Sequence, residues 1–216
     1  MKILPKKTDE LYANVLSALE EKMGKVGSEL NFGSPFQLLV AVMLSAQCTD
    51  KRVNQVTPEL FAHYPDAQSL AAAEFKDVFE LIRSVSYPNS KGRHLIEMAK
   101  MLISDFNGEI PSEPDELVKL PGVGRKTANV VASIVYNKPV IAVDTHVFRV
   151  SRRIGLSDGT TVEAVCKDLT AHIPADRRAD AHHWLLLHGR YVCTARSPHC
   201  DACPLTALCA EFAKTH

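Results

Sequence analysis

The sequence predicts an all-α protein. Almost every segment with a regular apolar pattern repeats at helical spacing, with hydrophobic residues at i, i+3, i+4 and i+7. Capping residues and glycine or asparagine stops separate these segments. Only residues 139–143 have the short apolar run of a strand. Connections are short, no fixed-period repeat is present, and 216 residues suffice for one large or two small helical domains.

The composition limits the classes of function. The chain has 25 basic and 25 acidic residues, so nucleic-acid binding cannot be inferred from its net charge of zero. No N-terminal targeting pattern is present, and the longest apolar run, residues 38–44, is too short to span a bilayer. We therefore expect a soluble, cytoplasmic protein with no membrane partner, whose six cysteines do not form a disulfide framework. We also expect a monomer, because no obvious exposed apolar face is left over.

The first third of the chain is predicted to form a buried central helix between amphipathic ones. The N-terminal helix has apolar residues every four positions, at Leu11, Val15, Leu19 and Met23. Ser34 and Pro35 mark the next start, with Gln37 three residues after the cap. Residues 38–46 of this helix are apolar on all sides, which predicts a central position in a core.

Several shorter helices are predicted next. Thr49 or Asp50 can cap a helix, and Pro58 after Thr57 predicts that another helix starts there. Amphipathic faces follow at residues 75–85 and 95–106, with a turn at residues 87–90 between them and a short helix at residues 112–120.

Residues 121–124, Pro-Gly-Val-Gly, form a turn before a helix with an apolar face at Ala128, Val131, Ala132 and Val135. Glycines allow positive φ and a close approach of a phosphate, which the N–H groups of the helix start can bind. The turn is not a nucleotide P-loop, because Arg125 follows Gly124, and no strand precedes it as a dinucleotide motif requires. We favour a DNA-phosphate clamp over a plain helix–turn–helix corner.

The surrounding stretch is strongly basic. Its basic residues are Lys119, Arg125, Lys126, Lys138, Arg149, Arg152 and Arg153, and Asp144 is its single acid. Four acids precede it, at Glu109, Glu113, Asp115 and Glu116, so charge is segregated along the chain. A basic patch in a neutral protein indicates a polyanionic partner, although a solvated basic face explains the charge equally well.

The segment LPGVGRKTANVV at residues 120–131, followed by VDTHVFRV at residues 143–150, resembles the endonuclease III family of base-excision DNA glycosylases. The resemblance extends from LNFGSPFQLLVAVMLSAQCTD through LHGRYVC to the C-terminal cysteines. It implies the helix-hairpin-helix glycosylase fold in two helical lobes. Residues 28–138 are then a six-helix domain, and residues 1–27 with 139–216 are a second lobe that carries an iron–sulfur cluster. The DNA site is expected between the lobes.

Lys126 and Asp144 are the candidate catalytic residues. The helix dipole and Arg125 should disfavour the ammonium form of Lys126, as a nucleophile requires, although a lone lysine is most often merely solvated. The chain advances about 18 Å along the helix and returns about 20 Å if extended, so Asp144 can lie near the helix start. Asp144 is otherwise a helix cap, and the two roles are compatible.

The resemblance assigns a mechanism and a substrate. Lys126 attacks C1′ of a flipped damaged nucleotide, while Asp144 assists deprotonation and stabilises positive charge on the sugar. The resulting Schiff base permits β-elimination, which cuts the strand. Duplex DNA that contains oxidised or ring-fragmented pyrimidines is the implied partner and substrate.

Base extrusion leaves a gap in the duplex that side chains must fill. The resemblance implies Gln47 for this role, and we infer Tyr87 as a second wedge, because relatives have an aliphatic residue and a tyrosine where this chain has Tyr87 and Pro88. The alternatives are a polar helix end and a half-buried turn aromatic. The expected DNA-contact residues are Gln47, Tyr87, Gly122, Val123, Gly124, Arg125, Arg149 and His146. For His146, the alternative role is to orient Asp144.

Four cysteines lie within 17 residues, at Cys193, Cys200, Cys203 and Cys209. This density in a cytosolic protein indicates metal ligands, and the spacing alone leaves zinc and [4Fe–4S] open. Pro204 slightly favours the cluster, and the resemblance decides for [4Fe–4S]. Cys48 and Cys166 are expected to be small, mostly buried residues without such a role.

Two other functions remain open. The first is a glycosylase of different base preference on the same fold. The second is a non-catalytic DNA-binding or redox-sensing iron–sulfur protein, in which Lys126 is dispensable and DNA is bound without being cut.

Overall fold

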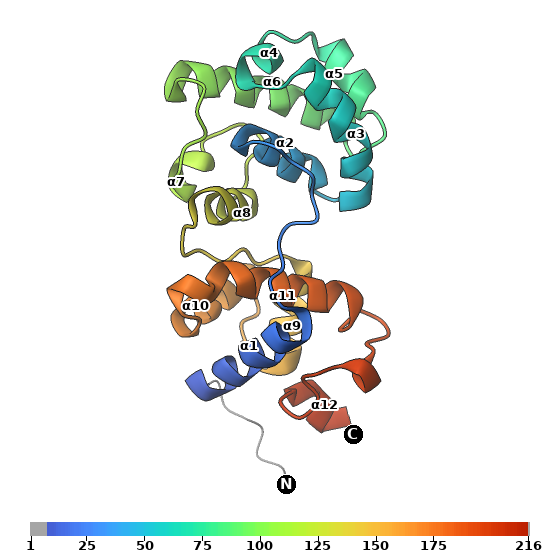
Figure 1. The fold of residues 1–216 in the computed structure, drawn as a ribbon, viewed down its shortest axis with the longest axis vertical. Coiled ribbons are helices and arrows are strands. Elements are labelled where there is room, and N and C mark those ends of the chain that lie inside the picture. The colour runs from blue at the N-terminus through green and yellow to red at the C-terminus, as the bar shows by residue number, and fades with distance from the viewer. Residues whose placement is uncertain (1–7, 216) are drawn as a thin grey trace. The chain divides into compact units, whose positions relative to one another are not determined.

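Every secondary-structure element assigned in the computed structural model, which describes residues 8–215, is a helix (Figure 1). The all-α prediction is therefore confirmed. The chain separates into two units. Unit 1 comprises Met1–Gly27 and Pro139–His216, and unit 2 comprises Ser28–Lys138. No helix in the described residues combines the length and the apolarity that a membrane span requires.

Unit 2 is built around α2 (Pro35–Ser45). The Ser34 hydroxyl caps this helix by accepting from the Gln37 N–H at 3.2 Å. Every residue from Leu38 to Leu44 is buried, which confirms the predicted central helix. Neighbouring helices α3, α6 and α8 surround it (Figure 1). The other helices of the unit are α3 (Asp50–His63), α4 (Ala67–Ala71), α5 (Phe75–Ile82), α6 (Pro88–Phe106), α7 (Pro114–Leu117) and α8 (Arg125–Tyr136).

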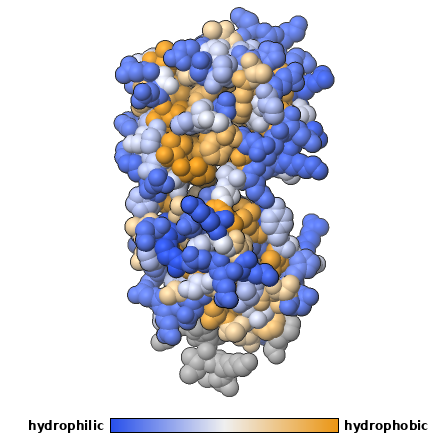
Figure 2. All heavy atoms as spheres, viewed as in Figure 1, coloured by the Kyte–Doolittle hydropathy of each residue, from blue (hydrophilic) through white to orange (hydrophobic). Residues whose placement is uncertain are grey.

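Unit 2 has the seven helices α2–α8, of which α4 and α7 are short, with 5 and 4 residues. Hydrophilic residues cover α3 and α5 in the view of Figure 2. This is the pattern of amphipathic helices that turn their apolar faces toward a buried centre.

Two helix starts differ from the prediction. Thr49 caps α3 as expected, but the helix then continues through Pro58, and Thr57 is buried within it. Proline removes one backbone hydrogen bond from a helix interior, and we attribute the continuation to the apolar face that α3 buries on both sides of Pro58. The predicted turn at residues 87–90 is instead the start of α6, with Tyr87 as N-cap and Pro88 in the first turn, where proline is favoured.

Unit 1 packs α11 against α9 and α1 (Figure 1). Its helices are α1 (Asp9–Met23), α9 (Thr145–Ile154), α10 (Val162–His172), α11 (Arg178–Tyr191) and α12 (Ala210–Thr215), with short 3-10 helices at Ala175–Arg177 and Cys200–Ala202. Trp184 on α11 is buried in the core, and its Nε1 donates to the Gly24 carbonyl at 2.8 Å. This bond fixes the end of α1 against the C-terminal part of the chain.

Residues 139–143 form no strand, which corrects the one strand-like prediction. Side chains of α10 and α11 bind their carbonyls in place of a neighbouring strand. The bonds run from Arg178 Nη1 to Pro139 O at 2.7 Å, from Cys166 Sγ to Ile141 O at 3.6 Å, and from His182 Nδ1 to Ala142 O at 2.8 Å. These donors fix the segment that leads to Asp144.

Candidate functional site

The Pro-Gly-Val-Gly turn is pressed closely against α6. Gly122 has φ +76°, and a Cβ at this position would lie 2.8 Å from the Cβ of His94. Gly124 is the N-cap of α8 and offers no side chain to the first N–H groups of the helix. Such a helix start is suited to bind a phosphate through its backbone. Arg125 and Lys126 are the first two residues of α8, and both are exposed.

Replacing Gly122 by alanine is expected to destabilise the protein by about 1–3 kcal/mol, because alanine disfavours the positive φ of this position and its Cβ would collide with His94. Gly124→Ser is the matched control. Gly124 has φ −85°, a Cβ added there would meet no atom within 4 Å, and serine is a favoured N-cap. Urea unfolding of both variants measures the difference, and an equal loss of stability would contradict the assigned turn geometry.

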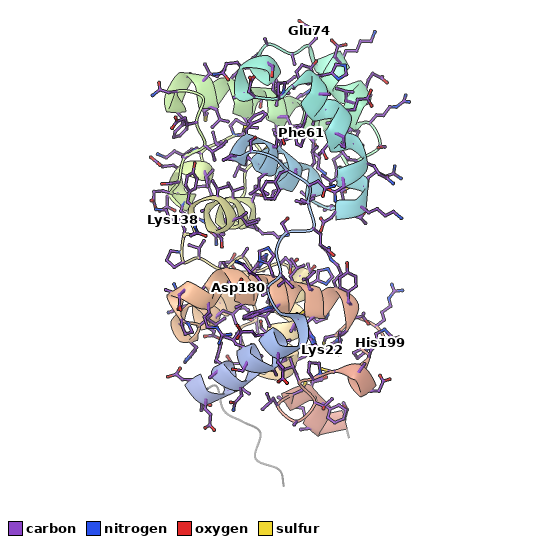
Figure 3. The ribbon with its side chains drawn as sticks, in the orientation of Figure 1. Lys22, Phe61, Glu74, Lys138, Asp180 and His199 are labelled. Carbon is purple, nitrogen blue, oxygen red and sulfur yellow. The ribbon has the colours of Figure 1, made fainter. Side chains whose placement is uncertain are left out.

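The acidic and basic stretches are not segregated in space. Arg125 Nη1 lies 2.6 Å from Asp115 Oδ1, and Lys138, just after α8 in Figure 3, pairs with Glu113. Both pairs are at least partly exposed, so each adds little stability. Two of the seven predicted patch cations therefore already have anionic partners within unit 2, which corrects the segregation inferred from the sequence.

Gln47 and Tyr87 have unusual backbone conformations. The non-glycine residues with positive φ in the described chain are Gln47 (54°), Tyr87 (56°), Asn107 and Asn137. The two asparagines are helix C-caps, where this conformation is common. Gln47 and Tyr87 have no such explanation, and strain of this kind gathers at functional sites.

The structure brings these two strained residues onto adjacent loops of unit 2. The Ser86 hydroxyl donates to the Gln47 carbonyl at 2.6 Å. Both residues are exposed, and the exposed fraction of Tyr87 is 62%, so the half-buried alternative for Tyr87 is wrong.

Asp144 is the N-cap of α9 in unit 1. Its Oδ1 accepts from the N–H groups of His146 and Val147 at 2.9 and 2.8 Å. These bonds confirm the capping role considered from the sequence. They also fix the carboxylate at the N-terminal end of the helix.

Arg149, predicted as a DNA contact, holds the cysteine-rich loop. Its guanidinium donates to the carbonyl of Cys193 at 3.1 and 3.2 Å and to that of Gly189 at 2.8 Å. Arg153, one turn later, donates to the carbonyls of Thr194 and Ala195 at 2.7 and 2.8 Å. The planar guanidinium matches these converging carbonyls. The geometry thus gives Arg149 a structural role that the sequence did not indicate.

The four C-terminal cysteines line one cavity. Its other lining residues include Ile154, His188, Val192, Leu205 and Phe212, so most of its wall is apolar. All four thiols are half-buried. Burial raises the pKa of the Cys203 and Cys209 thiols, and the charges of the other cysteines raise it further. Four thiolates that line one cavity repel one another unless a cationic group lies among them, which an iron–sulfur cluster provides.

His188 is a buried polar neighbour of this sulfur set. It is 3% exposed, and burial lowers its pKa to about 4, so its imidazole is neutral at neutral pH. Its Nε2 lies 3.6 Å from Cys203 Sγ. In the described residues, no three His, Cys, Asp or Glu side chains converge as ligands of a single metal ion. The loop itself is marked by His199 in Figure 3.

Two residues that bind the backbone around Gln47, namely Lys91 and Ser86, were not identified from the sequence. Lys91 Nζ donates to the carbonyls of Leu44 and Ala46, each at 2.7 Å, and Ser86 binds the next carbonyl along the chain. A signal was present, because Lys91 stands four residues before Leu95, in register with the buried face of α6. The two spare cysteines, Cys48 and Cys166, are largely buried, as predicted.

Comparison with known proteins identifies the family. Residues 40–175 match the model of the HhH-GPD superfamily of base excision DNA repair proteins, and residues 193–209 match the iron–sulfur binding domain of endonuclease III. The chain is 47% identical to endonuclease III of Rickettsia felis over 185 residues, which cover 86% of this chain and 87% of the relative. It is 45% identical to endonuclease III of Escherichia coli K12 over 198 residues, 90% of this chain and 92% of the relative.

A solved structure shows the same relationship. A trapped covalent intermediate of endonuclease III with DNA matches 96% of this chain and 98% of its own, with a TM-score of 0.91 and 43% identity. The glycine turn before α8 and the cysteine-rich loop lie within the regions that the two family models match. The chain therefore belongs to the endonuclease III family of base excision DNA repair enzymes.

Proposed function

We propose that this protein removes oxidised pyrimidines from duplex DNA and then cuts the strand at the abasic site. It is a DNA glycosylase and abasic-site lyase, as its family membership establishes. The observation that carries the residue assignment is the position of Lys126, the second residue of α8, directly after the tightly packed Gly122 turn. The covalent intermediate trapped in a relative supports a nucleophile on the protein.

Lys126 Nζ is the proposed nucleophile. It forms a bond to C1′ of the extruded nucleotide while the bond from C1′ to the base breaks, and the base leaves with the electron pair and takes up a proton. The Asp144 carboxylate assists removal of a proton from the amine and stabilises positive charge on the sugar. The sugar ring then opens as the C1′–O4′ bond breaks and O4′ takes up a proton, which converts the adduct to an imine. The imine acidifies C2′, loss of that proton expels the 3′ phosphate, and the strand is cut.

Binding is assigned to three groups of residues. Gly122, Val123, Gly124 and Arg125 hold a DNA phosphate at the start of α8. Gln47 and Tyr87 fill the gap that the extruded base leaves. His146 either contacts DNA or orients Asp144, to which its backbone N–H is already bonded.

Cys193, Cys200, Cys203 and Cys209 are the proposed ligands of the [4Fe–4S] cluster. When bound, the cluster supplies a fixed centre for the loop that Arg149 and Arg153 hold from the other side. We further propose that unit 2 is the helix-hairpin-helix lobe and unit 1 the cluster lobe. The protein acts as a monomer on DNA in a bacterial-type cytoplasm, without a membrane partner.

Borohydride trapping tests the proposed reaction. The protein is incubated with duplexes that contain one thymine glycol, one uracil, one 8-oxoguanine or no lesion. A covalent adduct and strand cleavage with the thymine glycol duplex alone are expected. Base release without an adduct would indicate a glycosylase that uses water, a different preferred lesion would revise the substrate, and tight binding without base release would indicate a binding protein.

Replacing Cys200 by serine is expected to lower the iron and sulfide content of the purified protein and its broad visible absorption, because one of the four proposed thiolates is lost. Cys48→Ser is the matched control, since Cys48 belongs to unit 2 and does not line the cavity, whose residues belong to unit 1. Unchanged iron in Cys200→Ser, or an equal loss in Cys48→Ser, would contradict the ligand assignment.

A further inference from the structure

Lys91 is a buried lysine whose ammonium group caps the C-terminal end of α2. It is 9% exposed, and its Nζ donates to the carbonyls of Leu44 and Ala46. The last carbonyls of a helix lack partners within it and carry partial negative charge, so an ammonium group is favoured there. Burial lowers the pKa of Lys91. Burial of an ammonium group is unfavourable unless hydrogen bonds compensate it, and these two bonds do so.

The chain makes a type II turn where Lys91 binds it. The Cys48 N–H donates to the Ser45 carbonyl at 3.0 Å, Ala46 has φ −57° and ψ 116°, and Gln47 has φ 54°. The third position of such a turn requires positive φ and normally holds glycine. A type I turn differs by a flip of the central peptide and would return Gln47 to negative φ. That central peptide carries the Ala46 carbonyl, which Lys91 holds.

The same residue also contacts the loop of Tyr87. The backbone N–H of Lys91 donates to the Tyr87 carbonyl at 3.1 Å, and the hydroxyl of the preceding Ser86 donates to the Gln47 carbonyl. Tyr87 is itself strained, because its φ is 56° and it stands immediately before a proline. A proline disfavours helical backbone conformations in the residue before it. Lys91 and Ser86 therefore connect the only two strained residues of the described chain that are not helix C-caps.

We propose that Lys91 and Ser86 are positioning residues that hold Gln47 and Tyr87 as one preformed pair for insertion into DNA. Lys91 fixes the peptide between Ala46 and Gln47 in the orientation that presents the Gln47 side chain outward, and Ser86 joins this turn to that of Tyr87. The inference rests on the proposed function, in which these two side chains fill the gap left by the extruded base. Preorganisation strengthens binding, because an unordered loop would have to be ordered on the DNA and this ordering costs binding free energy.

The test compares Lys91→Met with Lys100→Met, a lysine on the exposed face of the same helix. We measure kcat/KM on a thymine glycol duplex and, separately, cleavage of an abasic site in single-stranded DNA, which leaves no gap to fill. Lys91→Met is expected to lower the duplex value about tenfold and leave single-strand cleavage unchanged. Lys100→Met should change neither, and equal losses on both substrates in Lys91→Met would overturn the proposal.

A double-mutant cycle with Gln47→Ala separates positioning from general support of the fold. If Lys91 acts through Gln47, adding Lys91→Met to the Gln47→Ala variant lowers kcat/KM on the duplex by less than about twofold. The proposal would be overturned if the fold losses of the two single variants multiply in the double variant. A Gln47→Ala variant with full duplex activity would instead remove the assignment of Gln47 as a wedge, while the trapping experiment would still test the reaction itself.

A second variant applies if Lys91→Met does not fold. Ser86→Ala removes the bond to the Gln47 carbonyl from a half-exposed position, and Ser104→Ala on the exposed surface of α6 is its control. Ser86→Ala should lower duplex activity about threefold and be non-additive with Gln47→Ala. Full duplex activity in Ser86→Ala, or an effect additive with Gln47→Ala, would overturn the proposal.

Discussion

Replacing Lys126 by glutamine is expected to abolish borohydride trapping and to lower strand cleavage by at least about 10³, because no other primary amine replaces a removed nucleophile efficiently. DNA binding should persist, since the backbone of the turn and Arg125 remain. Gel-shift binding and single-turnover cleavage on a thymine glycol duplex measure both quantities.

Lys119→Gln is the matched control for this variant. Lys119 is an exposed lysine that precedes the same turn. Its loss should leave trapping intact, with weaker binding and a salt slope smaller by about one if it contacts a phosphate. A normal adduct in Lys126→Gln would place the nucleophile elsewhere, and loss of the adduct in Lys119→Gln would show that trapping reports binding instead of imine formation.

Replacing Asp144 by asparagine is expected to lower base release by about 10²–10⁴ and to change the free energy of unfolding little. Asparagine caps a helix about as well as aspartate, so the bonds to the N–H groups of His146 and Val147 are retained while the carboxylate is lost. Single-turnover release of thymine glycol and urea unfolding measure the two effects separately.

Asp144→Ala completes the comparison. Alanine removes both roles, so it should show the same catalytic loss and an additional destabilisation of about 1 kcal/mol. Equal base release in the parent and Asp144→Asn would leave Asp144 with its structural role alone. A large loss of stability in Asp144→Asn would show that the capping bonds depend on the charge.

Local features of the fold were predictable from the sequence because their partners lie within a few residues. Ser34 and Thr49 cap the helices that their positions indicated, and residues 38–44 are buried as their apolar character required. Pro58 was misread for a related reason. A proline after a threonine has the local appearance of a helix start, and only the burial of α3 on both sides of it shows that the helix continues.

The long-range contacts of the candidate site were not predictable in the same way. Arg149 binds a carbonyl 44 residues away, and Lys91 binds one 47 residues away, so neither partner can be identified from neighbouring sequence. Arg125 and Asp115 form a pair that the linear charge pattern placed in opposite patches. Residues 139–143 have the composition of a strand but are bound by side chains, because no strand among the described residues is available to pair with them.

The sequence by itself determined the helical class, the glycine turn and the group of four cysteines, because each depends on residue type and short spacing. Its resemblance to a known family supplied the candidate nucleophile. Tertiary structure alone decided which charged side chains are committed to carbonyls and which remain exposed at the turn. It also decided that Gln47 and Tyr87, 40 residues apart in the chain, lie on loops joined by Ser86. The physical reason is that a hydrogen bond forms where folding brings a donor and an acceptor together, whatever their separation in sequence.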